Sequence, residues 1–201
     1  MAIELETKFA VDSLEEIRGR LRAMSAEVTG PHFERNVLFD TPERTLRSAG
    51  EILRLRQTDK VTITHKKPQS PPIPQGLKAM EELETLAGDF ETMRQILHQL
   101  GFQEILWYEK CRETWRCGQA LVCLDILPFG RFVEIEADAA QIAGTAHCLG
   151  LDMAQAQALS YHDLFRLHLA KLGLPPADSF IFKPKERAEL LALCGHNGSV
   201  S

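Results

Sequence analysis

Charged and apolar residues alternate at every second position in one short segment after another along this chain. The first segment, IELETKFAV, places Glu4, Glu6 and Lys8 between apolar neighbours. Successive side chains of an extended strand point to opposite faces, so this pattern predicts a strand with one charged and one apolar face. One such strand is typical of any half-buried sheet. The recurrence of the pattern is what constrains the fold.

The alternation returns in EILRLRQ, VTITHKK, MEELETL, YEKCRETWRC and ALVCLDILPFGRFVEIEA. The short polar turn TDK joins EILRLRQ to VTITHKK and indicates a hairpin. With the opening segment, the charged faces carry seven acids and six bases, and the two signs gather on different strands. These residues are Glu4, Glu6, Glu82, Glu84, Asp125, Glu134, Glu136, Lys8, Arg54, Arg56, Lys66, Lys110 and Arg112.

Between these strands lie segments with helical spacing of apolar residues, at 12–24, 89–101, 139–151 and 159–173. Each has one apolar stripe, which must cover an apolar surface. If the helices pack on the apolar outer faces of the strands, the charged faces turn inward, and a sheet closed on itself lines its lumen with them. The sequence therefore predicts an α+β fold in which a polar-lined β-barrel is flanked by helices.

Composition narrows the class of protein. A chain of 201 residues is expected to form one domain with a real core. The net charge of −5 argues against a nucleic-acid partner, and no apolar run is long enough to span a bilayer, so we expect no membrane partner. Charges begin at the fourth residue, unlike a signal peptide, and the five cysteines contain no CxxC pair. We expect a cytoplasmic protein.

Enclosed charges are costly unless they are paired or bind a ligand. Clustered carboxylates suit hard divalent ions, and clustered Arg and Lys suit phosphate oxygens, so the two sets together predict a metal-bound polyphosphate. We expect Mg²⁺ or Mn²⁺ as the cofactor. The expected metal-side residues are Glu4, Glu6, Asp125, Glu134 and Glu136. The expected phosphate-side residues are Lys8, Arg54, Arg56, Lys66, Lys110 and Arg112.

The same segments resemble a known family. IELETKFAV is similar to the ExExK signature of the CYTH superfamily, the triphosphate tunnel metalloenzymes that include class IV adenylate cyclases and thiamine triphosphatases. NVLFDTP, LRLR, ITHK, EKCRETW, LDILPFGRFVEIE and SYHDL match in the family's order, over roughly residues 3–170. The resemblance implies an eight-stranded antiparallel barrel, dependence on a divalent metal, and chemistry on a triphosphate.

Some positions depart from the family pattern. Leu38 stands where relatives commonly have a tyrosine, and LKAMEELETL lacks the Arg that usually precedes the acidic pair. The register of that strand allows either Glu81 or Glu82 in the lumen, and Glu82 with Glu84 is favoured because Leu83 then points outward. We expect a CYTH tunnel domain over residues 1–174. Residues 175–201 are predicted to form a partly flexible extension with an added strand and helix.

Three functions follow from these features. Hydrolysis of inorganic tripolyphosphate or thiamine triphosphate is favoured, with a tunnel Glu or Lys that positions the attacking water; Lys8, Lys66, Glu82 and Glu84 are the candidate catalytic residues. A class IV adenylate cyclase would instead direct a ribose 3′-hydroxyl at the α-phosphorus. A non-catalytic polyphosphate-binding module would need the cations but not so many carboxylates. The partner is a small-molecule triphosphate, and a homodimer is left open.

Overall fold

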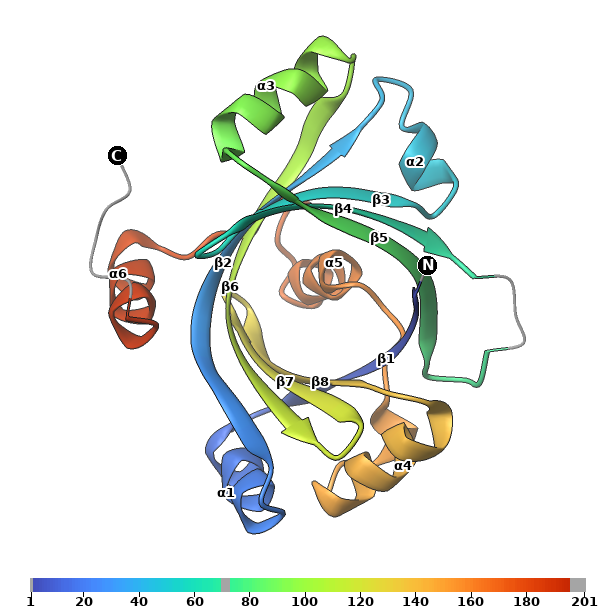
Figure 1. Cartoon of the computed structure of the whole chain (residues 1–201), viewed down its shortest axis with the longest axis vertical. Coiled ribbons are helices and arrows are strands. Elements are labelled where there is room, and N and C mark those ends of the chain that lie inside the picture. The colour runs from blue at the N-terminus through green and yellow to red at the C-terminus, as the bar shows by residue number, and fades with distance from the viewer. Residues whose placement is uncertain (1, 70–72, 196–201) are drawn as a thin grey trace.

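Eight antiparallel strands close into a ring in this protein (Figure 1). The computed structural model describes residues 2–69 and 73–195, with side chains described from residue 5 onward. The strands are β1 (Ala2–Val11), β2 (Glu27–Asp40), β3 (Ile52–Gln57), β4 (Val61–Pro68), β5 (Lys78–Ala87), β6 (Gln103–Cys117), β7 (Ala120–Leu127) and β8 (Gly130–Glu136). The predicted α+β fold with an eight-stranded antiparallel barrel is confirmed.

The strand order around the ring is β1-β5-β4-β3-β2-β6-β7-β8, and β8 pairs with β1 to close it. The register between β1 and β8 aligns the charged face of one strand with the charged face of the other: Lys8 lies opposite Glu134, and Glu6 lies opposite Glu136. Because side chains alternate along each strand, these pairs share the lumen face, whereas Phe9 and Val133 share the outer face. The hairpin predicted from TDK joins β3 to β4.

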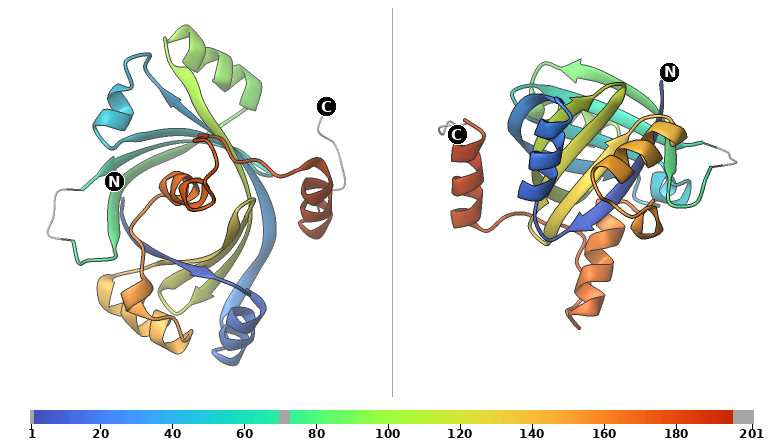
Figure 2. Two further views of the ribbon diagram at one scale, coloured as in Figure 1. Left: turned by 180° about the vertical axis from the view of Figure 1, so that it is seen from behind. Right: turned by 90° about the horizontal axis from the view of Figure 1, so that it is seen from below.

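Helices cover the outside of the ring and one of its ends (Figures 1 and 2). They are α1 (Glu15–Ala23), α2 (Thr45–Ser48), α3 (Phe90–Gln99), α4 (Ala139–Cys148), η1 (Met153–Gln155), α5 (Tyr161–Lys171) and α6 (Pro184–Leu193). Side-chain caps fix where several begin: Asp89 accepts a hydrogen bond from the Thr92 amide, and Ser160 forms a capping box with Asp163. None of the helices in the described part of the chain has the length and apolar character needed to cross a membrane.

The apolar core lies between the barrel wall and these helices. Ile17 and Leu21 of α1 and Ile142 of α4 pack against the outward side chains of β8, of which Val133 and Ile135 are completely buried. A second cluster joins α3 to the outward faces of β2 and β3. Burial of these outer faces leaves the inner faces to the charged residues, as the alternation predicts.

Helix α5 closes one end of the barrel. It lies inside the ring when viewed along the axis (Figure 1) and extends beyond the barrel end in the perpendicular view (Figure 2). Its N-terminal residue, Tyr161, joins a buried cluster with Phe132 and Phe180. Phe129 contacts Phe132 and Phe180 at ring-centroid distances of 5.4 and 5.2 Å. This aromatic cluster borders the lumen.

The segment after α5 returns to the outside of the barrel. Phe180 forms a single parallel bridge with Tyr108, where the sequence predicted a full added strand, and the predicted helix is α6. Helix α6 lies beside β2. The tail predicted to be loose is 195–201, and all of it after Gly195 falls outside the described residues.

Candidate active site in the barrel lumen

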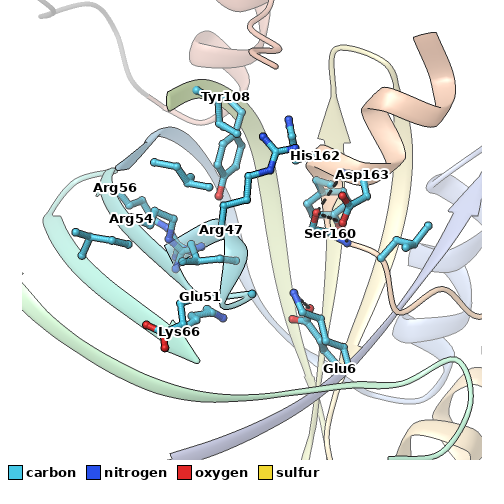
Figure 3. A pocket seen from close by; sticks show the side chains of 18 of the residues that line it. Glu6, Arg47, Glu51, Arg54, Arg56, Lys66, Tyr108, Ser160, His162 and Asp163 are labelled. Carbon is cyan, nitrogen blue, oxygen red and sulfur yellow. Dashed lines mark hydrogen bonds and ion pairs between the residues drawn. The ribbon is translucent and has the colours of Figure 1, made fainter. Parts of the chain in front are cut away.

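The lumen contains a cavity of about 500 Å³. It extends from the inward faces of the strands to α2 and to the N-terminus of α5 (Figure 3). Most of the charged residues predicted for the lumen line it, namely Lys8, Arg54, Arg56, Lys66, Lys110, Arg112, Glu6, Glu82, Glu84, Glu134 and Glu136. The structure therefore brings all six predicted phosphate-side bases together around one space.

Strands β3, β4 and β5 build one wall of the cavity. Lys66 Nζ lies 2.9 Å from Glu82 Oε2, and Arg54 Nη2 lies 3.7 Å from Glu84 Oε2. Thr64 donates a hydrogen bond of 2.6 Å to Glu84. Glu81 instead accepts a hydrogen bond from Gln69. The register therefore places Glu82 and Glu84, rather than Glu81, on the cavity wall.

Three carboxylates meet where β1 pairs with β8, on the part of the ring that follows β5. Ligand atoms of Glu6, Glu134 and Glu136 lie within 4.8 Å of one another. The Lys8 ammonium lies 2.6 Å from Glu6 Oε1 and 3.3 Å from Glu134 Oε2. Like charges at this spacing repel one another unless cations lie among them, and three converging oxygen donors suit a hard divalent ion. These residues fit such an ion.

Two predicted metal-side residues do not join this group. Arg112 binds Asp125 through two bonds of 2.7 and 2.6 Å, and the Tyr161 hydroxyl donates a third of 2.6 Å. Asp125 is completely buried by these partners, and Arg112 lies between it and Glu134. The side chain of Glu4 lies outside the described residues, although its backbone pairs with Met80 in the sheet.

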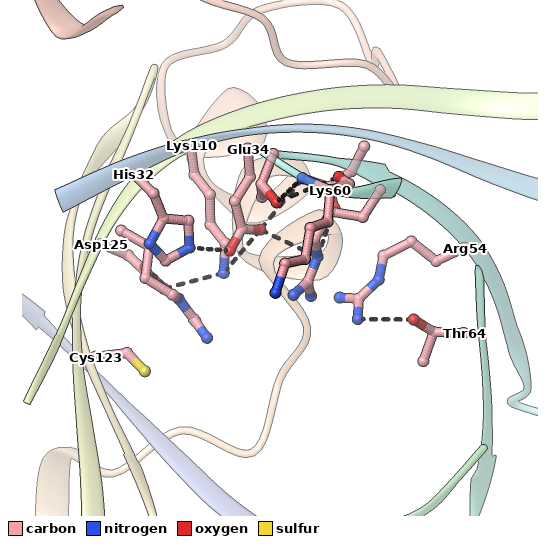
Figure 4. Close-up of polar contacts among 12 residues, drawn as sticks. His32, Glu34, Arg54, Lys60, Thr64, Lys110, Cys123 and Asp125 are labelled. Carbon is pink, nitrogen blue, oxygen red and sulfur yellow. Dashed lines mark hydrogen bonds and ion pairs between the residues drawn. The ribbon is translucent and has the colours of Figure 1, made fainter. Parts of the chain in front are cut away.

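The lumen face of β2 was not predicted from the sequence. Glu34 is completely buried there and lies 3.6 Å from Lys110 Nζ and 3.4 Å from Arg56 Nε (Figure 4). His32 bonds the same carboxylate at 3.2 Å. The alternation in PHFERNVLFD could have indicated Glu34 as a lumen residue. Arg35 obscures this alternation because it places a second charge on the outer face, where it lies over the Trp107 ring.

Two further lumen residues were not predicted. Lys78 begins β5, lines the cavity and places its ammonium 3.9 Å from Glu6. Lys78 and Glu82 share the inward face, so the alternation along LKAMEELETL was enough to predict Lys78 as a lumen residue. Lys78 also supplies a cation on the strand that lacks the expected Arg. Tyr161 was visible in SYHDL, but nothing local shows that a helix start reaches the lumen.

Burial and charge together set the protonation states in the lumen. Burial disfavours the Lys8 ammonium, but Glu134 and Glu6 outweigh this and raise its pKa. Burial also disfavours the Glu134 carboxylate, yet Lys8 and Arg112 hold its pKa well below the ordinary value. In Lys78 burial prevails and lowers the pKa. Glu134 is therefore ionised and Lys8 protonated at neutral pH.

The sequence pattern that defines the CYTH domain matches residues 2–148. The chain belongs to the CYTH domain family. The matched region runs from β1 to the end of α4, so the whole barrel is the CYTH domain, whereas α5 and α6 follow it. The residues predicted to bind metal and phosphate all lie on CYTH strands.

Other CYTH-like proteins share the sequence or the fold. A candidate adenylate cyclase of Methanocaldococcus jannaschii is 30% identical over 142 residues, which are 70% of this chain and 79% of that protein. The structure of a candidate adenylate cyclase from Vibrio parahaemolyticus superposes with a TM-score of 0.69 at 23% identity, over 81% of this chain and 97% of that one. An adenylyl cyclase candidate from Hippeastrum, described as having a dominant triphosphatase activity, gives a TM-score of 0.57 at 17% identity, over 86% and 97% of the two chains.

Leu38 lines the cavity and pairs with Leu106 of β6. Tyr108 follows two residues later on the same face of β6, opposite Asn36. Burial alone would raise the pKa of Tyr108, but the nearby Arg54 and Lys110 lower it. Strand β6 thus supplies a tyrosine to the lumen.

Proposed function

We propose that this CYTH protein hydrolyses a small triphosphate, tripolyphosphate or thiamine triphosphate, with the help of Mg²⁺ or Mn²⁺. One observation carries the proposal: a wall of bases and a group of three carboxylates face the same cavity of about 500 Å³. Phosphate binding alone requires the bases only. The additional convergence of Glu6, Glu134 and Glu136 supports a metal-bound phosphate and argues against a non-catalytic binding module.

The charge balance supports a triphosphate of about four or five negative charges. Arg54, Arg56 and Lys66 on one side and Lys110 and Arg112 on the other can each contact phosphate oxygens, with charge-assisted bonds to each. Glu6, Glu134 and Glu136 would hold the divalent ion, which neutralises charge on the transferred phosphoryl group. The chain of phosphates would then be fixed between the two walls, in line for attack.

Water attack on the terminal phosphorus needs a group that positions the water. Lys8 pairs with Glu6 and Lys66 pairs with Glu82, and Glu82 and Glu84 lie on β5, the strand beside β1, so these four remain the candidates. The raised pKa of Lys8 keeps it protonated, which favours a phosphate-binding and water-orienting role over proton abstraction. A carboxylate is then the better proton acceptor.

An adenylate cyclase is the alternative, and one feature of the cavity bears on the choice of substrate. Leu38, Ile52 and Ile105 give the cavity an apolar portion near α2, where an organic group can pack. Thiamine triphosphate also has such a group, so this feature separates organic triphosphates from tripolyphosphate rather than hydrolysis from cyclisation. The names of the relatives include both activities.

A substrate comparison tests the proposal. Purified protein is incubated with tripolyphosphate, thiamine triphosphate and ATP, each with Mg²⁺ or Mn²⁺, and kcat/KM is measured from the release of phosphate. We expect tripolyphosphate or thiamine triphosphate to exceed ATP, because the lumen devotes its polar groups to phosphate rather than to a base. A higher kcat/KM for ATP would contradict this preference. The cytoplasmic location, the lack of a nucleic-acid or membrane partner, and a homodimer stay predictions.

A further inference from the structure

Two cysteines from opposite ends of the chain meet on the outside of the barrel. Cys111 lies on β6 between lumen residues Lys110 and Arg112, so its side chain points outward, and it is buried. Cys194 follows the last residue of α6. Their Sγ atoms are 3.1 Å apart although the residues are separated by 83 positions. The contact joins the CYTH domain to the segment that follows it.

Neighbouring contacts hold the two thiols together without any help from the sulfurs. Glu109, two residues before Cys111, lies 3.0 Å from the Arg187 guanidinium of α6. The same carboxylate accepts a hydrogen bond of 3.1 Å from the Phe182 amide. The Phe182 and Phe33 rings pack at 6.0 Å. Helix α6 is therefore docked in a position that presents Cys194 to Cys111.

One thiol of the Cys111–Cys194 pair is suited to act as a nucleophile, and a cleft beside the pair is open to a small reagent. Cys194 is partly exposed, and the hydrogen bond that it shares with Cys111 lowers its pKa. A cleft of about 470 Å³ between α1 and the barrel wall borders both Cys111 and Leu193, the residue before Cys194. Thiolates rather than thiols attack disulfides, so Cys194 is the thiol poised to react first.

We propose that Cys111 and Cys194 form a reversible disulfide that fastens α6 to the barrel wall. The oxidant is a low-molecular-weight disulfide. The Cys194 thiolate attacks one of its sulfurs, forms a mixed disulfide and releases one thiolate. The Cys111 thiol loses its proton to that thiolate and attacks the Cys194 sulfur, which expels the second thiolate. Two electrons pass from the protein to the oxidant, and a dithiol such as dithiothreitol reverses the reaction.

The geometry allows this bond with little movement. The sulfurs must approach from 3.1 Å to about 2.05 Å. Cys194 lies at the C-terminal end of its helix, where a small shift disturbs few backbone hydrogen bonds. The bond would close a long loop of the chain, so it would restrict the unfolded state and raise the melting temperature by about 5–10 °C.

Oxidised glutathione tests the proposal on the full chain. After oxidation, alkylation and non-reducing peptide mapping should show two of the five thiols lost and a Cys111–Cys194 peptide pair, with a higher Tm that dithiothreitol reverses. Cys148 is exposed, so Cys148→Ser is the matched control and should behave like the unaltered protein. Cys194→Ser should lose both the peptide pair and the Tm shift. Cys111 that remains free to alkylate after oxidation, or a Tm shift that persists in Cys194→Ser, would overturn the proposal.

Discussion

Tyr161 organises the charges at the closed end of the lumen. Its hydroxyl donates to Asp125 at 2.6 Å, and Asp125 holds the Arg112 guanidinium through two further bonds. Its ring lies 5.3 Å from the Lys8 ammonium and 5.5 Å from that of Lys110. One side chain from α5 therefore positions three of the cations proposed to bind phosphate. Asp125, predicted to bind metal, is held by Arg112 and Tyr161 in this structure.

Two substitutions of Tyr161 separate the contribution of its hydroxyl to activity from that of its ring. Tyr161→Phe removes only the bond to Asp125, and we expect about a tenfold loss of kcat/KM because one such bond is worth roughly 1–1.5 kcal/mol. Tyr161→Leu also removes the ring beside Lys8 and Lys110 and should lose more. Steady-state kinetics check both, together with Tm. If both variants melt lower but keep kcat/KM, Tyr161 has a structural role only.

The three converging carboxylates, Glu6, Glu134 and Glu136, should be essential to activity and dispensable to the fold. Glu136 is the most exposed of the three, so Glu136→Gln removes the charge of a proposed metal ligand at little cost in packing. We expect phosphate release to fall at least 100-fold, with an unchanged circular dichroism spectrum and weaker Mn²⁺ binding in calorimetry. Glu113→Gln is a useful control, because Glu113 pairs with Arg18 outside the lumen. Equal activity in both variants would remove the case for a metal at this site.

At the scale of elements, alternation predicts well where only one face is charged. That condition holds for β1 and β3, whose lumen residues follow from period two alone, whereas β4 and β8 each also carry one charged residue on the outer face, Lys67 and Arg131. It fails for β2, where Arg35 stacks outward over Trp107 while Glu34 points inward. The closing helix α5 was predicted as a helix, but its place was not, because the contact of Tyr161 with Asp125 spans 36 residues. Local patterns contain no information on such contacts.

The register of β5 gives a test with a built-in control. Glu82→Gln removes the partner of Lys66 inside the cavity and should reduce kcat/KM by tenfold or more. Glu81→Gln changes the adjacent residue, which contacts Gln69, and should leave kcat/KM within about twofold. The two variants have the same charge. The reverse order of effects would show that the strand is shifted by one residue.

At the scale of the whole molecule, the lumen is one network of buried charges that should make stability depend on pH. Burial alone would raise the pKa of Glu34, but Lys110 and Arg56 hold it well below the ordinary value of 4.5. Below about pH 4.5 the unfolded chain therefore binds a proton at this position before the folded protein does. The stability that Glu34 contributes is complete above that pH and is lost as the pH falls further.

Unfolding in urea at several pH values checks this expectation. The free energy of unfolding should decline below about pH 4.5, and Glu34→Gln should make the decline shallower. At pH 7 the same variant should be destabilised by about 3–5 kcal/mol, because Lys110 and Arg56 lose a buried partner. An unchanged slope in Glu34→Gln would assign the acid sensitivity to other carboxylates.

We propose above all that the charged lumen hydrolyses a metal-bound triphosphate. The most direct measurement is product analysis by chromatography after incubation with Mg²⁺ and either tripolyphosphate or ATP, with a parallel sample in excess EDTA. We predict orthophosphate with a diphosphate product from each substrate, little cyclic AMP from ATP, and no turnover in EDTA. Cyclic AMP and pyrophosphate as the dominant products from ATP, or full turnover in EDTA, would contradict the claim.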